Sequence, residues 1–248
     1  MNRALAILLV AAALSSSACA LSQAERNRFT YHYEMGQSFY AENNVTGALV
    51  EFTEAERISP RDPKLLNFLG LAFYRKGRYG LAEEKFKKAL REKPSFSEAR
   101  NNLGVDYMEM KRWDDAIAQF RLVRNDIFYP DQTDAEMNLG LAYLGKGEYR
   151  EALPILRTVA ERSPRDFRAP LNLGRVYFAM GRTELAIGEY RKSLKLNDRY
   201  ANAYYNLALA ELKIQDQSAA RSAFREVVRI APDSEIGQLS SEYLDMLK

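Results

Sequence analysis

The chain has 248 residues, of which 47% are hydrophobic and 28% are charged, and its formal net charge is +3. Basic and acidic residues nearly balance, which excludes the strongly basic surface typical of nucleic-acid binding. There is one cysteine and one histidine. The chain therefore forms no intramolecular disulfide and offers no histidine–cysteine cluster for a metal ion.

The N-terminus predicts a signal peptide over residues 1–18. Arg3 supplies a positive charge, an apolar run extends from Ala4 to Leu14, and small residues follow as far as Ala18. This order of charged, apolar and small segments is typical of a secretory leader. Because the apolar run is shorter than the about 20 residues that a membrane-spanning helix needs, we expect export without a transmembrane anchor.

Cys19 directly follows this leader, where bacterial lipoproteins carry the cysteine that is acylated. By this resemblance Cys19 would hold the protein in the membrane through acyl chains such as palmitate. Two or three such chains anchor stably where one is marginal. Ala20 stands where inner-membrane lipoproteins have aspartate, which implies the periplasmic face of the outer membrane. Residues 19–28 would then be the lipidated cysteine and a polar tether that spans at most about 30 Å.

An alternative for this region is ordinary cleavage after Ala20, because Ala18 and Ala20 also form a small-x-small site. Ser16 departs from the lipoprotein pattern, which prefers leucine three residues before the cysteine. Without lipidation the product would be a soluble periplasmic protein.

From residue 29 onward the chain repeats itself. Small residues recur at intervals of 34, 34, 36, 34 and 34, namely Gly36, Gly70, Gly104, Gly140, Gly174 and Ala208. Alanine recurs twelve places after each of them, and a bulky residue follows four places later, namely Phe52, Phe86, Phe120, Leu156, Tyr190 and Phe224. Each unit has two apolar runs at helical spacing around a polar turn, and this pattern predicts a helix–turn–helix hairpin.

The recurring glycine costs about 1 kcal/mol relative to alanine inside a helix, so its small size must matter. We expect it to let the second helix approach closely, with the alanine facing it and the bulky residue one turn along. The repeats extend over 29–62, 63–96, 97–132, 133–166, 167–200 and 201–234. An apolar stripe in residues 235–248 predicts a helix that caps the last repeat, and it consists of Ile236, Leu239, Tyr243, Leu244 and Leu247.

The period and the residue types resemble the tetratricopeptide repeat. This resemblance implies an all-α protein of six hairpins that stack into a right-handed superhelix. Two places depart from the pattern: repeat 3 is two residues longer around 127–130, and Pro154 lies inside the second helix of repeat 4. We expect both to change the local shape of the stack, and both are candidate contacts for a partner.

The sequence indicates no catalytic, cofactor or metal site. His32 has no partner histidine or cysteine and falls at an interior helix position, which predicts a packing role. Residues 140–147 imitate a phosphate-binding loop, but glycine stands where serine or threonine would bind magnesium, and no strand precedes it. We therefore expect a protein without enzymatic activity, cofactor or small-molecule substrate.

The inner faces of the first helices predict a peptide-binding groove, because stacked hairpins expose these faces side by side. The candidate residues are Tyr33, Tyr40, Asn67, Leu71, Tyr74, Asn102, Met108, Asn138, Leu141, Asn172, Phe178 and Asn206. Their apolar members suit anchors of an extended or helical peptide, and asparagine both donates to and accepts from a peptide backbone. Two alternatives stay open: the apolar residues pack against neighbouring helices instead, and the asparagines are simply common in such repeats.

The leader that ends at Cys19, the six repeats, the longer connection after repeat 3 and the C-terminal helix together resemble the pilotins, the lipoproteins of type IV pilus biogenesis of the PilF, PilW and Tgl kind. Members of that family help the pilus secretin to reach the outer membrane or to assemble into its ring. The resemblance implies a non-enzymatic assembly factor that binds a secretin subunit. The alternative is a periplasmic lipoprotein scaffold for cell-wall or envelope enzymes.

Overall fold

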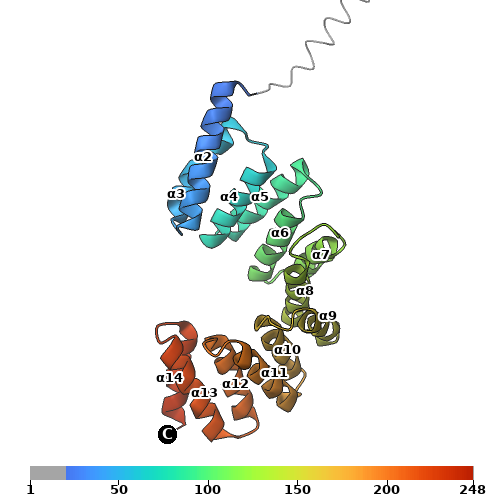
Figure 1. Ribbon diagram of the computed structural model, residues 1–248, viewed down its shortest axis with the longest axis vertical. Coiled ribbons are helices and arrows are strands. Elements are labelled where there is room, and N and C mark those ends of the chain that lie inside the picture. Colours follow the sequence, from blue (N-terminus) through green and yellow to red (C-terminus); the bar gives the residue numbers. More distant parts are fainter. Residues whose placement is uncertain (1–20, 248) are drawn as a thin grey trace, which may run out of the picture. The chain divides into compact units, whose positions relative to one another are not determined.

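The computed structural model describes residues 21–247. The regular structure in this part of the chain is entirely helical, in the thirteen helices α2 to α14 (Figure 1). The predicted signal peptide and Cys19 lie outside the described residues. No helix within 21–247 is both long and apolar enough to cross a bilayer. The chain divides into two compact units, of which the first ends at Phe96 and the second begins at Ser97.

The first unit consists of two helical hairpins. Its helices are α2 (Gln23–Ala41), α3 (Val45–Ile58), α4 (Pro63–Arg75) and α5 (Tyr79–Glu92). α2 packs along α3, α4 packs along α5, and α3 contacts α4. α4 begins sharply because Asp62 accepts a hydrogen bond from the Leu65 amide at 2.8 Å and Pro63 occupies the first turn, where its missing N–H does no harm.

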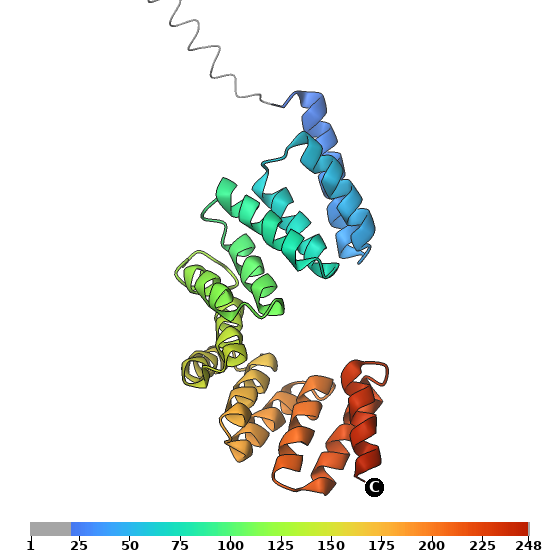
Figure 2. The ribbon, with the colours of Figure 1, turned by 180° about the vertical axis from the view of Figure 1, so that it is seen from behind.

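The second unit consists of four further hairpins and a final helix. Its helices are α6 (Ser97–Glu109), α7 (Trp113–Arg124), α8 (Gln132–Lys146), α9 (Tyr149–Arg162), α10 (Arg168–Ala179), α11 (Thr183–Leu196), α12 (Ala201–Lys213), α13 (Gln217–Ile230) and α14 (Glu235–Met246). Each helix packs against the next one along the chain. Figure 2 shows the same elements from behind, and in both views α12, α13 and α14 lie side by side.

The C-terminal helix α14 lies against the last hairpin. The ring of Tyr243 stacks on that of Phe224 in α13, with centroids 4.7 Å apart. Ser234 begins the helix by accepting a hydrogen bond from the Gly237 amide at 3.1 Å. α14 thus covers an apolar part of α13 that would otherwise face solvent.

Each recurring glycine leaves room for a side chain of the second helix, as its small size predicts. A Cβ atom on Gly70 would lie 2.5 Å from the Phe86 ring, and one on Gly174 would lie 2.5 Å from the Tyr190 ring. The expected contact differs in one detail, because the bulky residue itself lies over the glycine and the alanine does not lie nearest to it. These rings are fully buried, so each one fills the space that the glycine leaves.

The polar tether predicted for residues 19–28 is wrong for residues 23–28, which form the first turns of α2. Ser22 accepts a hydrogen bond from the Glu25 amide at 3.2 Å, and the Glu25 carboxylate accepts one from the Ser22 amide at 2.8 Å. This reciprocal pair satisfies two backbone donors at the helix start. The helix therefore begins before the first repeat.

Each hairpin turns at one residue in the left-handed region of backbone space. These residues are Asn43, Gly77, Lys111, Gly147, Gly181 and Gln215. They follow the spacing of the recurring small residues, so the same backbone turn is used in every repeat. Glycine adopts this conformation without the steric cost that other residues bear.

The two departures from the repeat lie in the second unit. The longer connection joins α7 to α8, and α9 continues through Pro154 to Arg162. Proline lacks the backbone N–H that would bond to the carbonyl four residues earlier. The hydroxyl of Thr158 donates to the Pro154 carbonyl at 3.0 Å, so one turn later a side chain supplements the backbone bonding.

Candidate peptide-binding groove

A hollow lies along the inner faces of α8, α10 and α12, the first helices of repeats 4, 5 and 6. Its volume is about 510 Å³. Its walls include Asn138, Leu141, Asn172, Arg175, Tyr205 and Asn206. The structure therefore brings together four residues of the predicted groove, three of which are asparagines at equivalent repeat positions.

The three asparagines differ in how much of the amide they expose. Asn138 donates to the Oδ1 atom of Asn101 at 3.3 Å, and Asn206 donates to the carbonyl of Asn202 at 2.7 Å. Both are half-buried, whereas Asn172 is only 6% exposed. Because the amides of Asn138 and Asn206 each retain a donor and an oxygen, these two suit hydrogen bonds to a peptide backbone.

The hollow is more polar than the apolar trough that the sequence predicts. Met137 and Leu171 form part of its floor, and each is only 4% exposed. Of the predicted apolar anchors, Leu141 lines the hollow. Side chains of this kind pack against the adjoining helices, so hydrogen-bonding groups make up much of the accessible surface.

Two arginines line the hollow, and they differ in their partners. Arg168 pairs with Asp166 at 2.7 Å and with Asp134 at 2.8 Å, and these contacts, with the Asp166 hydrogen bond foremost, raise the pKa of Arg168. Arg175 forms no ion pair within the described residues, and its Nη1 atom donates to the Oδ1 atom of Asn172 at 3.3 Å. An acidic group of a ligand would therefore find Arg175 without a carboxylate partner.

The predicted groove residues of the first unit lie in a different environment. The rings of Tyr33 and Tyr40 pack edge-on against Phe68 of α4, with centroids 5.7 and 6.2 Å away. Arg75 lies over the Tyr40 ring at 3.8 Å, and Asn67 is only 1% exposed. These side chains fill the space between α2 and α4, which leaves the Asn67 amide no surface for a ligand.

The remaining predicted residues are partly buried on first helices. Leu71 and Tyr74 lie on α4, Asn102 and Met108 lie on α6, and Phe178 lies on α10. The Tyr74 ring lies 5.6 Å from that of Tyr79, and the ammonium group of Lys213 lies 4.6 Å from the centre of the Phe178 ring. A peptide-binding role for these residues stays a prediction.

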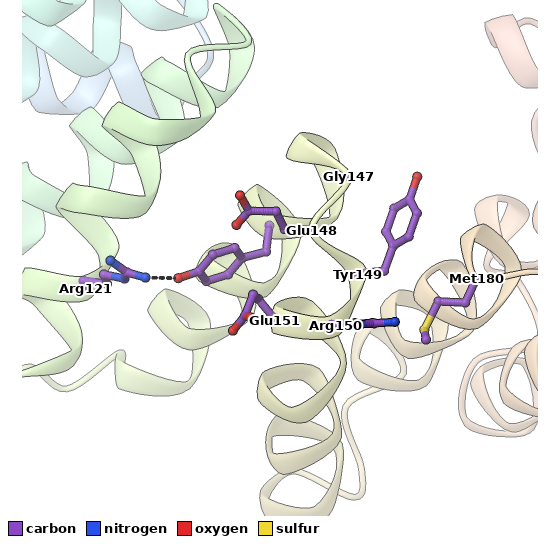
Figure 3. A pocket seen from close by; sticks show the side chains of 8 residues that line it. Arg121, Gly147, Glu148, Tyr149, Arg150, Glu151 and Met180 are labelled. Atoms are coloured by element: carbon purple, nitrogen blue, oxygen red, sulfur yellow. Dashed lines mark hydrogen bonds between the residues drawn. The ribbon is translucent and has the colours of Figure 1, made fainter.

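A second hollow, of about 750 Å³, lies at the turn between α8 and α9. Arg121 reaches into it and donates a hydrogen bond to the hydroxyl of Tyr143, and Glu148, Glu151 and Met180 also line it (Figure 3). Glu148 pairs with Lys146 at 2.5 Å. The charged groups that bind one another here serve the packing of the hairpins, and they form no nucleophile–base pair.

The Arg121 contact belongs to a series that sequence reasoning missed. Arg157 of α9 donates to the Tyr177 hydroxyl at 3.3 Å, and Arg191 of α11 pairs with Glu211 at 2.7 Å. In each case an arginine on a second helix bonds to the first helix of the next repeat. The sequence could have indicated this series, because Arg121, Arg157 and Arg191 are 36 and 34 residues apart, which is the spacing of the repeats.

His32 bonds to Glu51 across the first hairpin, with 2.7 Å between its Nδ1 atom and the carboxylate, and this contact links α2 to α3. No group of histidine, cysteine or acidic side chains suited to a metal ion occurs between residues 21 and 247.

Repeated helical hairpins with a hollow on their inner faces define a class of scaffolds that bind other proteins. The chain belongs to the tetratricopeptide repeat family, whose model matches residues 33–95, 101–167, 137–201 and 171–235. Proteins of this family are generally non-enzymatic. The all-α fold expected from the sequence is confirmed.

Relatives of known identity include members of several multiprotein assemblies. BBSome complex member BBS4 of Bos taurus is 25% identical over 205 residues, which are 82% of this chain and 39% of that protein. Type IV pilus assembly protein PilF of Pseudomonas aeruginosa is 26% identical over 113 residues, which are 46% of this chain and 45% of that protein. The chain thus spans less than half of each of these two relatives.

Solved structures resemble the chain over most of its length. The structure of Pseudomonas aeruginosa PilF has a TM-score of 0.70 and 19% identity, and the match covers 89% of this chain and 99% of that one. PilW, titled a widely conserved type IV pilus biogenesis factor, has a TM-score of 0.77 and 19% identity, and the match covers 88% and 98%. At this level of identity the likeness shows a shared fold.

Proposed function

We propose that this protein assists the assembly or outer-membrane localisation of a type IV pilus secretin by binding a segment of the secretin subunit. Support comes from the fold, which matches nearly the whole of PilF and PilW. In this proposal acyl chains on Cys19 hold the repeats at the periplasmic face of the outer membrane. The groove of α8, α10 and α12 is the binding site.

The chemistry of this groove suggests what the bound segment looks like. Asn138 and Asn206 would bond to its backbone, and Leu141 would contact an apolar side chain. Arg175 would pair with an acidic side chain, because no carboxylate within the described residues already neutralises it. The expected ligand is an extended segment with both an acidic and an apolar residue.

Deletion of the gene tests the proposal. We expect the secretin to remain monomeric or to be misplaced, as detected by multimer bands on mild-detergent gels and by membrane fractionation. Complementation with Arg175→Glu should fail, whereas Arg182→Glu, which changes an exposed arginine outside the groove lining, should succeed. Normal secretin multimers and normal pili in the deletion strain would contradict the proposal.

The proposed anchoring through acyl chains on Cys19 can be tested separately. Mass spectrometry of the mature N-terminus should detect acyl modification on Cys19, and Cys19→Ala should move the protein into the soluble periplasmic fraction. An unmodified N-terminus would remove the anchor from the proposal. If the protein instead co-purified with cell-wall hydrolases or synthases and with no secretin, the scaffold alternative would replace it.

A further inference from the structure

The longer connection between α7 and α8 is held in one shape by Asp126. Its amide donates to the Val123 carbonyl at 2.9 Å, and its carboxylate accepts hydrogen bonds from the Phe128 amide at 3.1 Å and from the Ser97 hydroxyl. The Gln132 side chain donates to the Asp126 carbonyl at 2.8 Å. The tip of this connection is therefore an ordered element.

Two large apolar side chains project from that tip. Ile127 is 78% exposed and Phe128 is 88% exposed. Leu122, on the adjoining helix α7, is 51% exposed. Exposed apolar side chains on an ordered loop indicate a contact surface, and we call Ile127 and Phe128 the apolar tip.

A shallow hollow lies on the same two repeats. Arg124, Glu136, Pro154, Ile155 and Thr158 line it, and its volume is about 250 Å³. Arg124 is the last residue of α7, so the hollow begins where the connection begins. Because Phe128 is almost fully exposed, it does not occupy this hollow in its own chain. We call this hollow the Pro154 pocket.

The tip and the pocket carry opposite charges that the described residues leave unpaired. Arg124 is exposed and forms no ion pair within residues 21–247. Asp131 is exposed, makes no capping hydrogen bond at the start of α8, and likewise has no ion-pair partner there. Burial raises the pKa of Tyr129 to about 12, and the nearby carboxylates of Asp131, Glu98 and Asp134 add to the shift, so Asp131 lies close to the base of the tip.

We propose that this surface binds a second copy of the chain about a two-fold axis. The apolar tip of each copy enters the Pro154 pocket of the other, and Asp131 of each copy lies against Arg124 of the other. A two-fold contact needs complementary features on one surface, because the same residues serve on both sides. The tip, the pocket and the two unpaired charges meet that requirement, whereas an anionic membrane could pair with Arg124 but would leave Asp131 without a partner.

This assembly goes beyond the proposed secretin function and does not depend on it. Both departures from the repeat pattern, the longer connection and Pro154, contribute to the surface. A groove on the inner faces and a dimer surface elsewhere on repeats 3 and 4 could act independently.

Sedimentation velocity of the full chain tests the proposal, with Cys19→Ser introduced so that acyl chains add no association of their own. We expect a concentration-dependent dimer. Phe128→Ser should weaken dimerisation about tenfold or more, as expected for an aromatic residue at the centre of an interface. Leu185→Ser is the matched control, because Leu185 is 51% exposed on α11 and lies outside the surface.

A charge exchange separates this contact from a general loss of folding. Asp131→Arg and Arg124→Asp should each weaken the dimer, and the double variant should restore it, because it rebuilds both ion pairs. Melting curves check that each variant is folded. A monomer at every concentration, or a dimer unaffected by Phe128→Ser and by both charge variants, would overturn the proposal. Binding of the monomer to phosphatidylglycerol vesicles that Phe128→Ser abolishes would also overturn it, in favour of a membrane contact.

Discussion

Gly181 and Gly188 lie in the same repeat, but replacing each with alanine should change the stability of the protein in opposite directions. Gly181 has a φ of 76° in the turn between α10 and α11, and Gly188 lies within α11, yet a Cβ on either would meet no atom within 4 Å. Gly181→Ala should destabilise the protein by about 1 kcal/mol, because alanine is strained in the left-handed region. Gly188→Ala should stabilise it by up to about 1 kcal/mol, because alanine is the better helix former.

Urea unfolding followed by circular dichroism measures both effects. The midpoint should fall for the first variant and rise for the second. Equal shifts in the same direction would mean that the turn conformation of Gly181 is not the cause. Since a repeat protein can unfold in stages, the midpoints of the variants are the quantity to compare.

Glu56 links two second helices of the first unit through its carboxylate. It pairs with Lys85 at 2.6 Å and with Lys88 at 3.1 Å, both on α5. Burial raises the pKa of Glu56, but the hydrogen bonds from both lysines outweigh it, and the net shift is downward from 4.5. A lowered pKa means that the stabilisation is present above the unfolded-state value and is lost as the pH falls through the folded-state value.

The prediction that follows compares Glu56→Gln with the parent protein. At neutral pH the variant should melt at a lower temperature, because it leaves Lys85 and Lys88 without their carboxylate partner. The difference should shrink as the pH falls below the ordinary glutamate value of 4.5, since the parent then loses the same interaction. A melting difference that stays constant from pH 7 to the acid range would contradict this explanation.

Among the helices, α9 carries a local cost at Pro154. A proline inside a helix removes one backbone hydrogen bond and costs about 3 kcal/mol where nothing compensates for it. Pro154 lies on the exposed side of α9, and the bond from Thr158 to the Pro154 carbonyl does not replace the bond that the missing Pro154 N–H would make to the carbonyl four residues earlier. Pro154→Ala should therefore stabilise the protein by about 1 to 3 kcal/mol, as a higher unfolding midpoint would show. An unchanged midpoint would mean that the helix already accommodates the proline without cost.

The helices could be predicted from the sequence because their cause is local and repeated. A bulky residue sixteen positions after a glycine recurs in successive units and predicts both helices of a hairpin, as Gly70 with Phe86 illustrates. The start of α2 was missed because it depends on a cap, Ser22 with Glu25, that lies outside the repeat. The repeat pattern therefore predicts the helices that the repeats share, but it does not predict the extra helical turns that precede the first repeat.

The groove could be predicted only in part. The same spacing of residues along a helix occurs on a face that packs against a neighbouring helix and on a face that lines a hollow. Tyr33 and Asn138 occupy the inner faces of first helices, but the Tyr33 ring contacts Phe68 and Asn138 lines a hollow. Which outcome occurs depends on the size of the side chains on the neighbouring helix. Phe68 fills the space beside Tyr33, a contact that no single position reveals.

At the scale of the whole molecule, the groove and the apolar tip should act as separate surfaces. Arg175→Glu should weaken binding of the purified secretin subunit about tenfold or more, because a charge-assisted contact becomes a repulsion. The same variant should dimerise normally, and Phe128→Ser should bind the subunit normally. Isothermal titration calorimetry of both variants against the same subunit checks this. If Phe128→Ser abolished subunit binding and Arg175→Glu did not, the secretin would be held by the tip, and the inner groove would have no part in its capture.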